Sequence, residues 1–70
     1  MDRIPVSSTN IYSVGYDSDS AVLEVEFRSG DVYRYFDVPV FLYHRLLSAS
    51  SLGQFLNDNI RYYYRYQKIS

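Results

Sequence analysis

The triplet Tyr-Arg-Tyr occurs twice in this chain, at residues 33–35 and 64–66, and nine of the 70 residues are tyrosine. A tyrosine side chain joins a flat apolar ring to a polar hydroxyl, and an arginine side chain is a flat cation that stacks and forms paired hydrogen bonds. Such pairs serve as half-buried packing or as contacts to the bases and phosphates of a nucleic acid. The two triplets therefore predict a binding module, and they do not identify its ligand.

The C-terminal segment holds the strongest candidate binding residues. Read as a β-strand, residues 61–69 place Arg61, Tyr63 and Arg65 on one face, which alternates cation, ring and cation. Such a face stacks a base on Tyr63 while the guanidinium groups hold phosphate oxygens, and Lys68 adds a further cation. The opposite face is expected to pack in the core and carries Tyr62, Tyr64 and Tyr66. A second interpretation stays open, in which the arginines only protect an edge strand from aggregation.

The first triplet lies in a predicted strand in which alternate side chains face opposite ways. Tyr33 and Tyr35 share one face, for which packing in the core is favoured over stacking on a ligand. The residues expected to contact that face are Leu23, Val25 and Phe27. Arg34 projects from the opposite face, where Glu24 or Glu26 is expected to pair with it for about 0–1 kcal/mol. Arg34 is kept as a candidate ligand contact.

Period-two alternation of apolar residues predicts three antiparallel strands, at residues 10–16, 21–27 and 32–36. Gly30 suits the turn between the last two, because that turn favours positive φ. The period then changes, and helices are predicted at residues 39–49 and 51–60. Pro39 suits the first helical position, and Ser51 with Gln54 forms a capping-box pattern.

The predicted fold class is therefore α+β: a three-stranded antiparallel meander followed by two short helices and a C-terminal strand or extended tail. A chain of this length forms one domain, so residues 1–70 are expected to fold as a single unit. With 47% hydrophobic and 21% charged residues, the chain is too apolar for a disordered tail.

Composition also limits the classes of function. The chain has no cysteine, no signal-peptide pattern and no apolar run of the roughly 20 residues that span a bilayer, so a cytoplasmic protein without membrane contact is expected. Its net charge is −1, and only the last ten residues are basic, which disfavours duplex nucleic acid. The single histidine, His44, lies on the polar side of a predicted helix, and the carboxylates are scattered. We therefore expect no enzyme, no metal and no cofactor.

Val40 and Phe41 give the first predicted helix an apolar edge outside its buried stripe. The stripe itself is expected to contain Leu42, Tyr43, Leu46 and Leu47. If Val40 and Phe41 are exposed, they form an interface for a second copy or for another protein. The alternative is that Phe41 folds back over the core.

A resemblance to a known family rests on residues spread along nearly the whole chain. They are Leu23, Val25, Phe27, Ser29-Gly30, Val32 to Tyr35, Val38-Pro39, Tyr43, Leu46-Leu47, Ala49 to Ser51, Gly53, Asn57, Ile60-Arg61, Tyr64 and Tyr66. In this order and spacing they resemble the KTSC domain, which is named for the C-terminus of some lysyl-tRNA synthetases and also occurs as small bacterial and phage proteins. The chain departs from that family at Val40 and Phe41, where acidic residues are typical, and at Tyr62 and Arg65, where glycine and proline are common.

The resemblance implies a central Tyr-x-Tyr signature, matched by Tyr33 and Tyr35, and a role in RNA binding inferred from the synthetase attachment. The sequence thus predicts a non-enzymatic binding module for a nucleotide or single-stranded nucleic acid, with RNA favoured. The alternative is a phage-encoded protein-interaction module that self-associates or binds a host protein. An oligomer that sequesters a small nucleotide between subunits combines the two.

Overall fold

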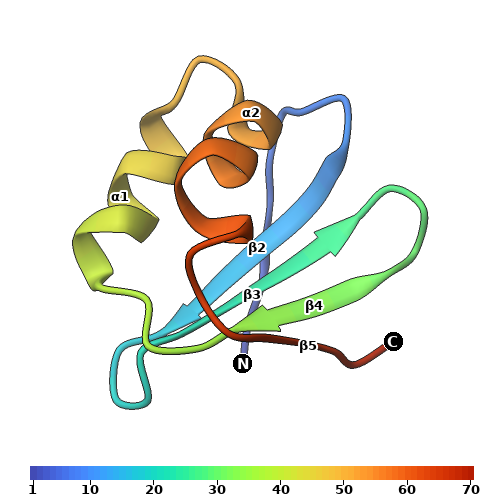
Figure 1. The fold of residues 1–70 in the computed structure, drawn as a ribbon. Helices are drawn as coiled ribbons and strands as arrows, with labels where there is room; N and C mark the ends of the chain where they lie inside the picture. Colours follow the sequence, from blue (N-terminus) through green and yellow to red (C-terminus); the bar gives the residue numbers. More distant parts are fainter.

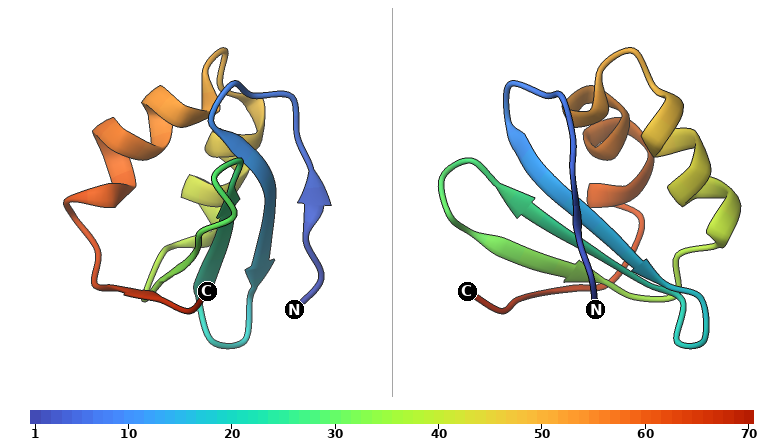
Figure 2. Two further views of the ribbon diagram at one scale, coloured as in Figure 1. Left: turned by 90° about the vertical axis from the view of Figure 1, so that its right-hand side faces the viewer. Right: turned by 180° about the vertical axis from the view of Figure 1, so that it is seen from behind.

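A computed structural model describes residues 1–70 and shows one five-stranded antiparallel sheet with the helices gathered on one side of it (Figures 1 and 2). The strands follow the order β1-β2-β3-β4-β5 across the sheet. Along the chain the elements are β1 (Ile4–Pro5), β2 (Ile11–Asp17), β3 (Val22–Phe27), β4 (Val32–Tyr35), α1 (Val40–Ser48), α2 (Leu52–Leu56), the π-helical turn η1 (Asn57–Arg61) and β5 (Tyr66–Lys68). The α+β class is confirmed, but the sheet has five strands where three with a C-terminal strand or tail were expected.

The inner face of the sheet carries the apolar residues of the alternating strands. In the β3–β4 register, Leu23 lies opposite Tyr35 and Val25 lies opposite Tyr33, so all four point toward the helices, as predicted. A β-bulge at Tyr12 keeps this face continuous on β2, because the extra residue lets Ile11 and Val14 both point inward. The core consists of Ile11, Val14, Leu23, Val25, Tyr35, Val38, Leu42, Leu46, Leu52, Leu56 and Ile60.

The helical layer follows the predicted segments with two differences. Pro39 is the N-cap of α1 and not its first helical residue, and Leu47 is exposed where burial was expected. The capping prediction is confirmed, since the Ser51 hydroxyl accepts a hydrogen bond from the Gln54 amide at 3.3 Å. None of the helices has the length and hydrophobicity that crossing a membrane requires.

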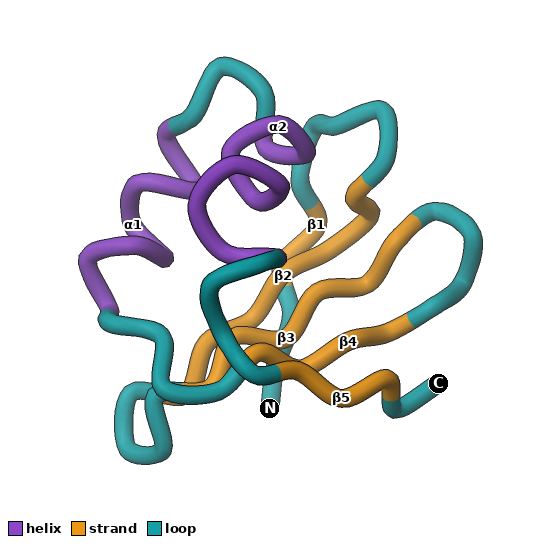
Figure 3. The backbone as a smooth tube through the Cα atoms, viewed as in Figure 1, coloured by secondary structure: helices purple, strands orange, loops and turns teal.

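The C-terminal segment differs most from its prediction (Figure 3). Residues 61–69 do not form one strand, because Arg61 ends η1, a turn follows, and only Tyr66–Lys68 pairs with β4. The physical reason lies at Ile60, which is fully buried among the core residues and therefore keeps the chain helical to this point. The Ile60 carbonyl then accepts the amides of Tyr63 and Tyr64, which turns the chain back toward the sheet.

Candidate functional site

Five aromatic rings and one arginine surround a pocket of about 180 Å³ between the end of η1 and the inner face of the sheet. We call it the aromatic pocket, and it is lined by Phe27, Tyr33, Tyr35, Arg61, Tyr62 and Tyr66. Three strands and the helical layer thus contribute to one concave site. A concave apolar surface with few polar groups is the usual form of a small-ligand site.

The strand register brings the rings together. Tyr35 lies directly opposite Tyr66 in the β4–β5 pair, so both rings are on the same face of the sheet. The ring centres of Tyr33 and Tyr66 are 5.8 Å apart, and those of Tyr35 and Tyr66 are 6.1 Å apart. Phe27 meets the Tyr33 ring edge to face at 5.7 Å. These spacings are typical of mutually stabilising aromatic pairs, so the ring positions are set before a ligand binds.

The Tyr35 hydroxyl is a polar group that the protein itself does not use. Tyr35 is only 3% exposed, and its hydroxyl takes part in none of the side-chain hydrogen bonds of the structure. The Tyr35 side chain lines the aromatic pocket. Burial raises the pKa of Tyr35, and the nearby Arg61 charge offsets part of that rise. The hydroxyl therefore stays protonated at neutral pH and is free to donate a hydrogen bond.

Arg61 supplies the positive charge of the aromatic pocket. It is the last residue of η1, it is exposed, and it forms no ion pair within the chain. Its guanidinium lies 5.5 Å from the centre of the Tyr62 ring, which orients it by a cation–π contact. π-Helical turns recur at functional sites, because they aim a side chain that a regular helix would direct elsewhere.

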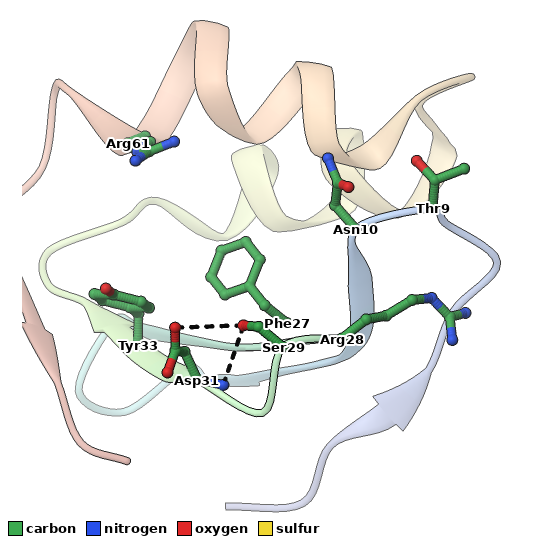
Figure 4. Close-up of a pocket in the computed structure, with 8 residues that line it drawn as sticks. All are labelled: Thr9, Asn10, Phe27, Arg28, Ser29, Asp31, Tyr33 and Arg61. Carbon is green, nitrogen blue, oxygen red and sulfur yellow. Dashed lines mark hydrogen bonds between the residues drawn. The ribbon is translucent and has the colours of Figure 1, made fainter.

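A second, more polar opening of about 350 Å³ adjoins the aromatic pocket and shares Phe27, Tyr33 and Arg61 with it. Its other lining residues are polar or charged and are Thr9, Asn10, Arg28, Ser29 and Asp31. Figure 4 shows Arg61 on the helical side of this opening and Asp31 on the sheet side, with the Phe27 ring between them. The Asp31 carboxylate accepts a hydrogen bond from the Ser29 hydroxyl at 3.3 Å and lies 3.4 Å from the Lys68 ammonium.

The structure separates the residues that were expected to share one strand face. Of these, only Arg61 lines the aromatic pocket. Tyr63 is 70% exposed outside it, and the Arg65 guanidinium lies 4.9 Å from the centre of the Phe36 ring. Lys68 pairs with Asp31 at the rim. The common face of Arg61, Tyr63 and Arg65 was therefore a wrong prediction, since the turn after η1 breaks the alternation.

The opposite tyrosine set was also placed incorrectly. Tyr62 and Tyr66 are mostly exposed and face the pocket, where a buried strand face was expected. Only Tyr64 packs partly against the core.

Arg34 lies on the outer face of the sheet, away from the aromatic pocket. Its guanidinium donates to Glu24 at 2.8 Å, and the Arg3 guanidinium contacts the other oxygen of that carboxylate at 2.6 Å. Glu24 is only 4% exposed. Burial raises the pKa of Glu24, but the hydrogen bonds and charges of Arg34 and Arg3 outweigh this, so its pKa lies below the usual range. The predicted pairing is confirmed, and the position of Arg34 does not favour a ligand contact.

Sequence reasoning underrated the pocket tyrosines. Alternation correctly placed Tyr33, Tyr35 and Phe27 on one face, and Tyr35 does belong to the core as expected. Tyr33 is only half-buried, however, and lines both openings. The missing signal was the pairing of Tyr66 with Tyr35, which depends on a register that the sequence does not display.

The structure decides between the two alternatives left open for Phe41, because Val40 and Phe41 are both exposed. Phe41 is 53% exposed and so does not cover the core, its neighbour Val40 is exposed, and Leu47 is exposed nearly two turns further along α1. The Arg45 guanidinium lies 5.3 Å from the centre of the Phe41 ring. His44 is exposed on the same helix, and no group of three or more metal-ligating side chains is found in the structure.

Comparison with known proteins gives one consistent family. The profile of the KTSC domain matches residues 7–66. An uncharacterized protein of Stutzerimonas stutzeri (strain A1501) is 43% identical over 70 residues, which cover 99% of each chain. A lysine–tRNA ligase of Trichormus variabilis is 38% identical over 55 residues, which cover 79% of this chain and 10% of the ligase. The crystal structure of a KTSC domain protein from Yersinia pestis superimposes with a TM-score of 0.95 at 39% identity, covering 99% of this chain and 97% of that one.

Proposed function

We propose that this chain, which belongs to the KTSC domain family, is a non-enzymatic module that binds a nucleotide or a single-stranded nucleic acid, with RNA favoured. The ligand base stacks in the aromatic pocket, and Arg61 binds a phosphate or a polar base edge. The observation that carries the proposal is the pocket itself, in which five rings surround an arginine without an ion-pair partner.

Stacking on aromatic side chains contributes roughly 1–3 kcal/mol per base and tolerates any base, because every base has a π-face. The pocket volume of about 180 Å³ limits the stacked group to something of the size of one base. The neighbouring opening, which shares Arg61, gives room for the part of the nucleotide that extends beyond the stacked ring.

The charge distribution supports a single-stranded ligand over a duplex. Duplex binding depends on a broad set of cations that neutralise phosphates. Here Arg3 and Arg34 are paired with Glu24, and Lys68 is paired with Asp31. RNA is favoured over a free nucleotide because three of the relatives are named lysine–tRNA ligase, and tRNA is an RNA.

The test is a calorimetric titration of the protein with nucleoside monophosphates and short single-stranded RNAs at low salt. Arg61→Gln is expected to weaken binding at least tenfold and to leave the melting temperature nearly unchanged, because Arg61 is exposed. Arg45→Gln is the matched control, since Arg45 makes a similar cation–π contact on α1 away from the pocket. Absence of heat with every ligand would overturn the proposal.

A second candidate function, protein interaction, is favoured by the exposed apolar residues Val40, Phe41 and Leu47 on α1. Exposed apolar groups that lie close together mark interaction sites in small proteins. Phe41→Glu is expected to abolish any concentration-dependent increase in mass measured by light scattering. A wild-type protein that stays monomeric at high concentration and retains no partner in a pull-down would remove this candidate.

A further inference from the structure

We infer that the aromatic pocket and the polar opening beside it together select guanine among the four bases, an inference that rests on the function proposed above. It follows from the polar groups that surround the rings. These groups lie on two sides of the site, and each side matches a different edge of the same base.

The helical side of the site offers hydrogen-bond donors. Arg61 carries a fork of N–H donors and has no acceptor, and it forms no ion pair within the chain. Tyr35 also lines the pocket, and its hydroxyl is a further donor for a group bound there. A guanidinium fork binds two adjacent acceptors best, and guanine presents them as O6 and N7.

The sheet side of the site offers a carboxylate acceptor. Asp31 is the only acidic residue that lines either opening. Its position is fixed by the Ser29 hydroxyl and by the Lys68 ammonium, which leave room on the two oxygens for further donors. Guanine presents two adjacent donors, N1–H and N2–H, on its Watson–Crick edge, and a carboxylate accepts both.

The Phe27 and Tyr33 rings connect the two sides, since both line both openings. Phe27 and Tyr33 meet edge to face, so a base stacks on one of the two rings, with Arg61 on its helical side and Asp31 on its sheet side, in the arrangement of side chains that Figure 4 shows. The aromatic lining supplies the stacking, and Arg61 and Asp31 supply the selection. The third charged group of the lining, Arg28, already donates to the Ser8 carbonyl oxygen at 2.8 Å.

None of the other three bases presents both a pair of adjacent acceptors and a pair of adjacent N–H donors on different atoms. Adenine places an amino donor beside N7, which Arg61 has no acceptor to receive. Cytosine likewise offers an amino group as its only donor to a carboxylate, and uracil has a single N–H between two carbonyl oxygens. A site built to hydrogen-bond a particular edge rejects a base that lacks it, because the protein group then stays desolvated and unpaired.

The test titrates the intact protein with GMP, AMP, CMP and UMP, followed by inosine monophosphate and 7-deaza-GMP. GMP is expected to bind at least tenfold more tightly than the other three common nucleotides. Inosine monophosphate lacks the N2 amino group that would face Asp31, and 7-deaza-GMP lacks the N7 acceptor that would face Arg61. Each is expected to lose about tenfold in affinity relative to GMP.

Two substitutions locate the selection. Asp31→Asn is expected to remove the difference between GMP and inosine monophosphate while leaving the cost of 7-deaza-GMP in place. Asp19→Asn is the control, because Asp19 lies in an exposed turn between β2 and β3 and lines no part of the site. Its affinities are expected to equal those of the wild type.

The outcomes separate this inference from the function on which it rests. Equal affinity for all four nucleotides overturns guanine selection and leaves the binding function standing. No binding by any nucleotide or RNA overturns both. An RNA pentamer with one guanosine among uridines then distinguishes a base within a strand from a free nucleotide. Tighter binding of that pentamer than of GMP supports a single-stranded ligand, and weaker binding supports a free nucleotide. If a pentamer with adenosine in place of the guanosine binds equally well, the inference is overturned.

Discussion

The two faces of the sheet use the same Tyr-Arg-Tyr triplet in opposite ways. On the outer face, Arg34 is held with Arg3 around the buried Glu24 carboxylate, and the charges are satisfied within the chain. On the inner face, Tyr33 and Tyr35 line a pocket in which Arg61 forms no ion pair. A closed network stabilises the fold, whereas an open group of rings and an unpaired cation is available to a ligand.

The outer face is therefore expected to contribute mainly to the stability of the fold, and the inner face mainly to ligand binding. Substitutions on the outer face should change the free energy of unfolding and leave affinity for the ligand unchanged. Substitutions at the rim of the aromatic pocket should do the reverse.

The largest effect on stability is expected from Glu24→Gln. This change removes the carboxylate between Arg3 and Arg34 and leaves two neighbouring cations without their partner. Because both arginines keep partial access to water, we expect a loss of about 2–3 kcal/mol in the free energy of unfolding, below the upper range for a fully buried pair. Urea denaturation measures it, and affinity for the ligand should equal that of the wild type wherever the protein is folded.

Tyr66→Ala should produce the complementary result. It removes a ring from the aromatic pocket and is expected to weaken binding by roughly 1–3 kcal/mol, the contribution of one stacking contact. Tyr66 is more than half exposed, so stability should fall only by its ring contacts with Tyr33 and Tyr35, roughly 0.5–1.5 kcal/mol for each aromatic pair. Tyr63→Ala is the matched control, because Tyr63 is an exposed tyrosine outside the pocket. A larger loss of affinity for Tyr63→Ala would restore the strand-face interpretation of the tail.

The stabilising contributions of the two faces should also be lost at opposite ends of the pH range. The lowered pKa of Glu24 gives stability that is present above its unfolded value of about 4.3 and is lost as pH falls through the folded value. The raised pKa of Tyr35 gives stability that is present below its unfolded value of about 10 and is lost as pH rises through the folded value. Melting temperatures measured across the pH range show both losses, as an acid limb and an alkaline limb of the stability profile. Glu24→Gln should flatten the acid limb, and Tyr35→Phe should reduce the alkaline limb, to which Tyr16 and Tyr43 also contribute.

The smallest expected effect is a gain in stability from Ala21→Gly. Ala21 has φ 57° in the turn between β2 and β3, a left-handed conformation that costs a residue with a side chain roughly 1–2 kcal/mol. Glycine relieves this strain but loses more backbone entropy on folding, so the net gain should be about 0.5–1 kcal/mol. Ligand affinity should not change, because the turn belongs to neither functional face. A destabilised Ala21→Gly variant would show that the turn is not strained.

Those parts of the fold that depend on local patterns were predictable. Alternation gave β2, β3 and β4, the helical period gave α1 and α2, and the Ser51 cap was read from spacing alone. Arg34 was correctly paired with Glu24 because both residues occupy outward positions of neighbouring strands.

The two edge strands were not predictable as strands of the sheet, since each is short and depends on distant pairing. β1 contains only Ile4–Pro5, and its place is marked by Gly15, where an added Cβ would lie 2.5 Å from the Asp2 carbonyl oxygen. β5 contains only Tyr66–Lys68, and its register with β4 decides which tyrosines meet in the pocket. The candidate site was therefore visible only in part, as Arg61 and as the shared face of Tyr33 and Tyr35.

The central claim is that the aromatic pocket, and not the outer face or the α1 edge, is where the ligand binds. The most direct test is an NMR titration with an equimolar mixture of the four ribonucleoside monophosphates at low salt. Binding in the aromatic pocket should produce the largest shifts in the ring protons of Tyr33 and Tyr66 and in the side-chain Nε–H of Arg61, with the Arg34 Nε–H unmoved. Shifts centred on Arg34 or Phe41, or none at the pocket at saturating ligand, would contradict it.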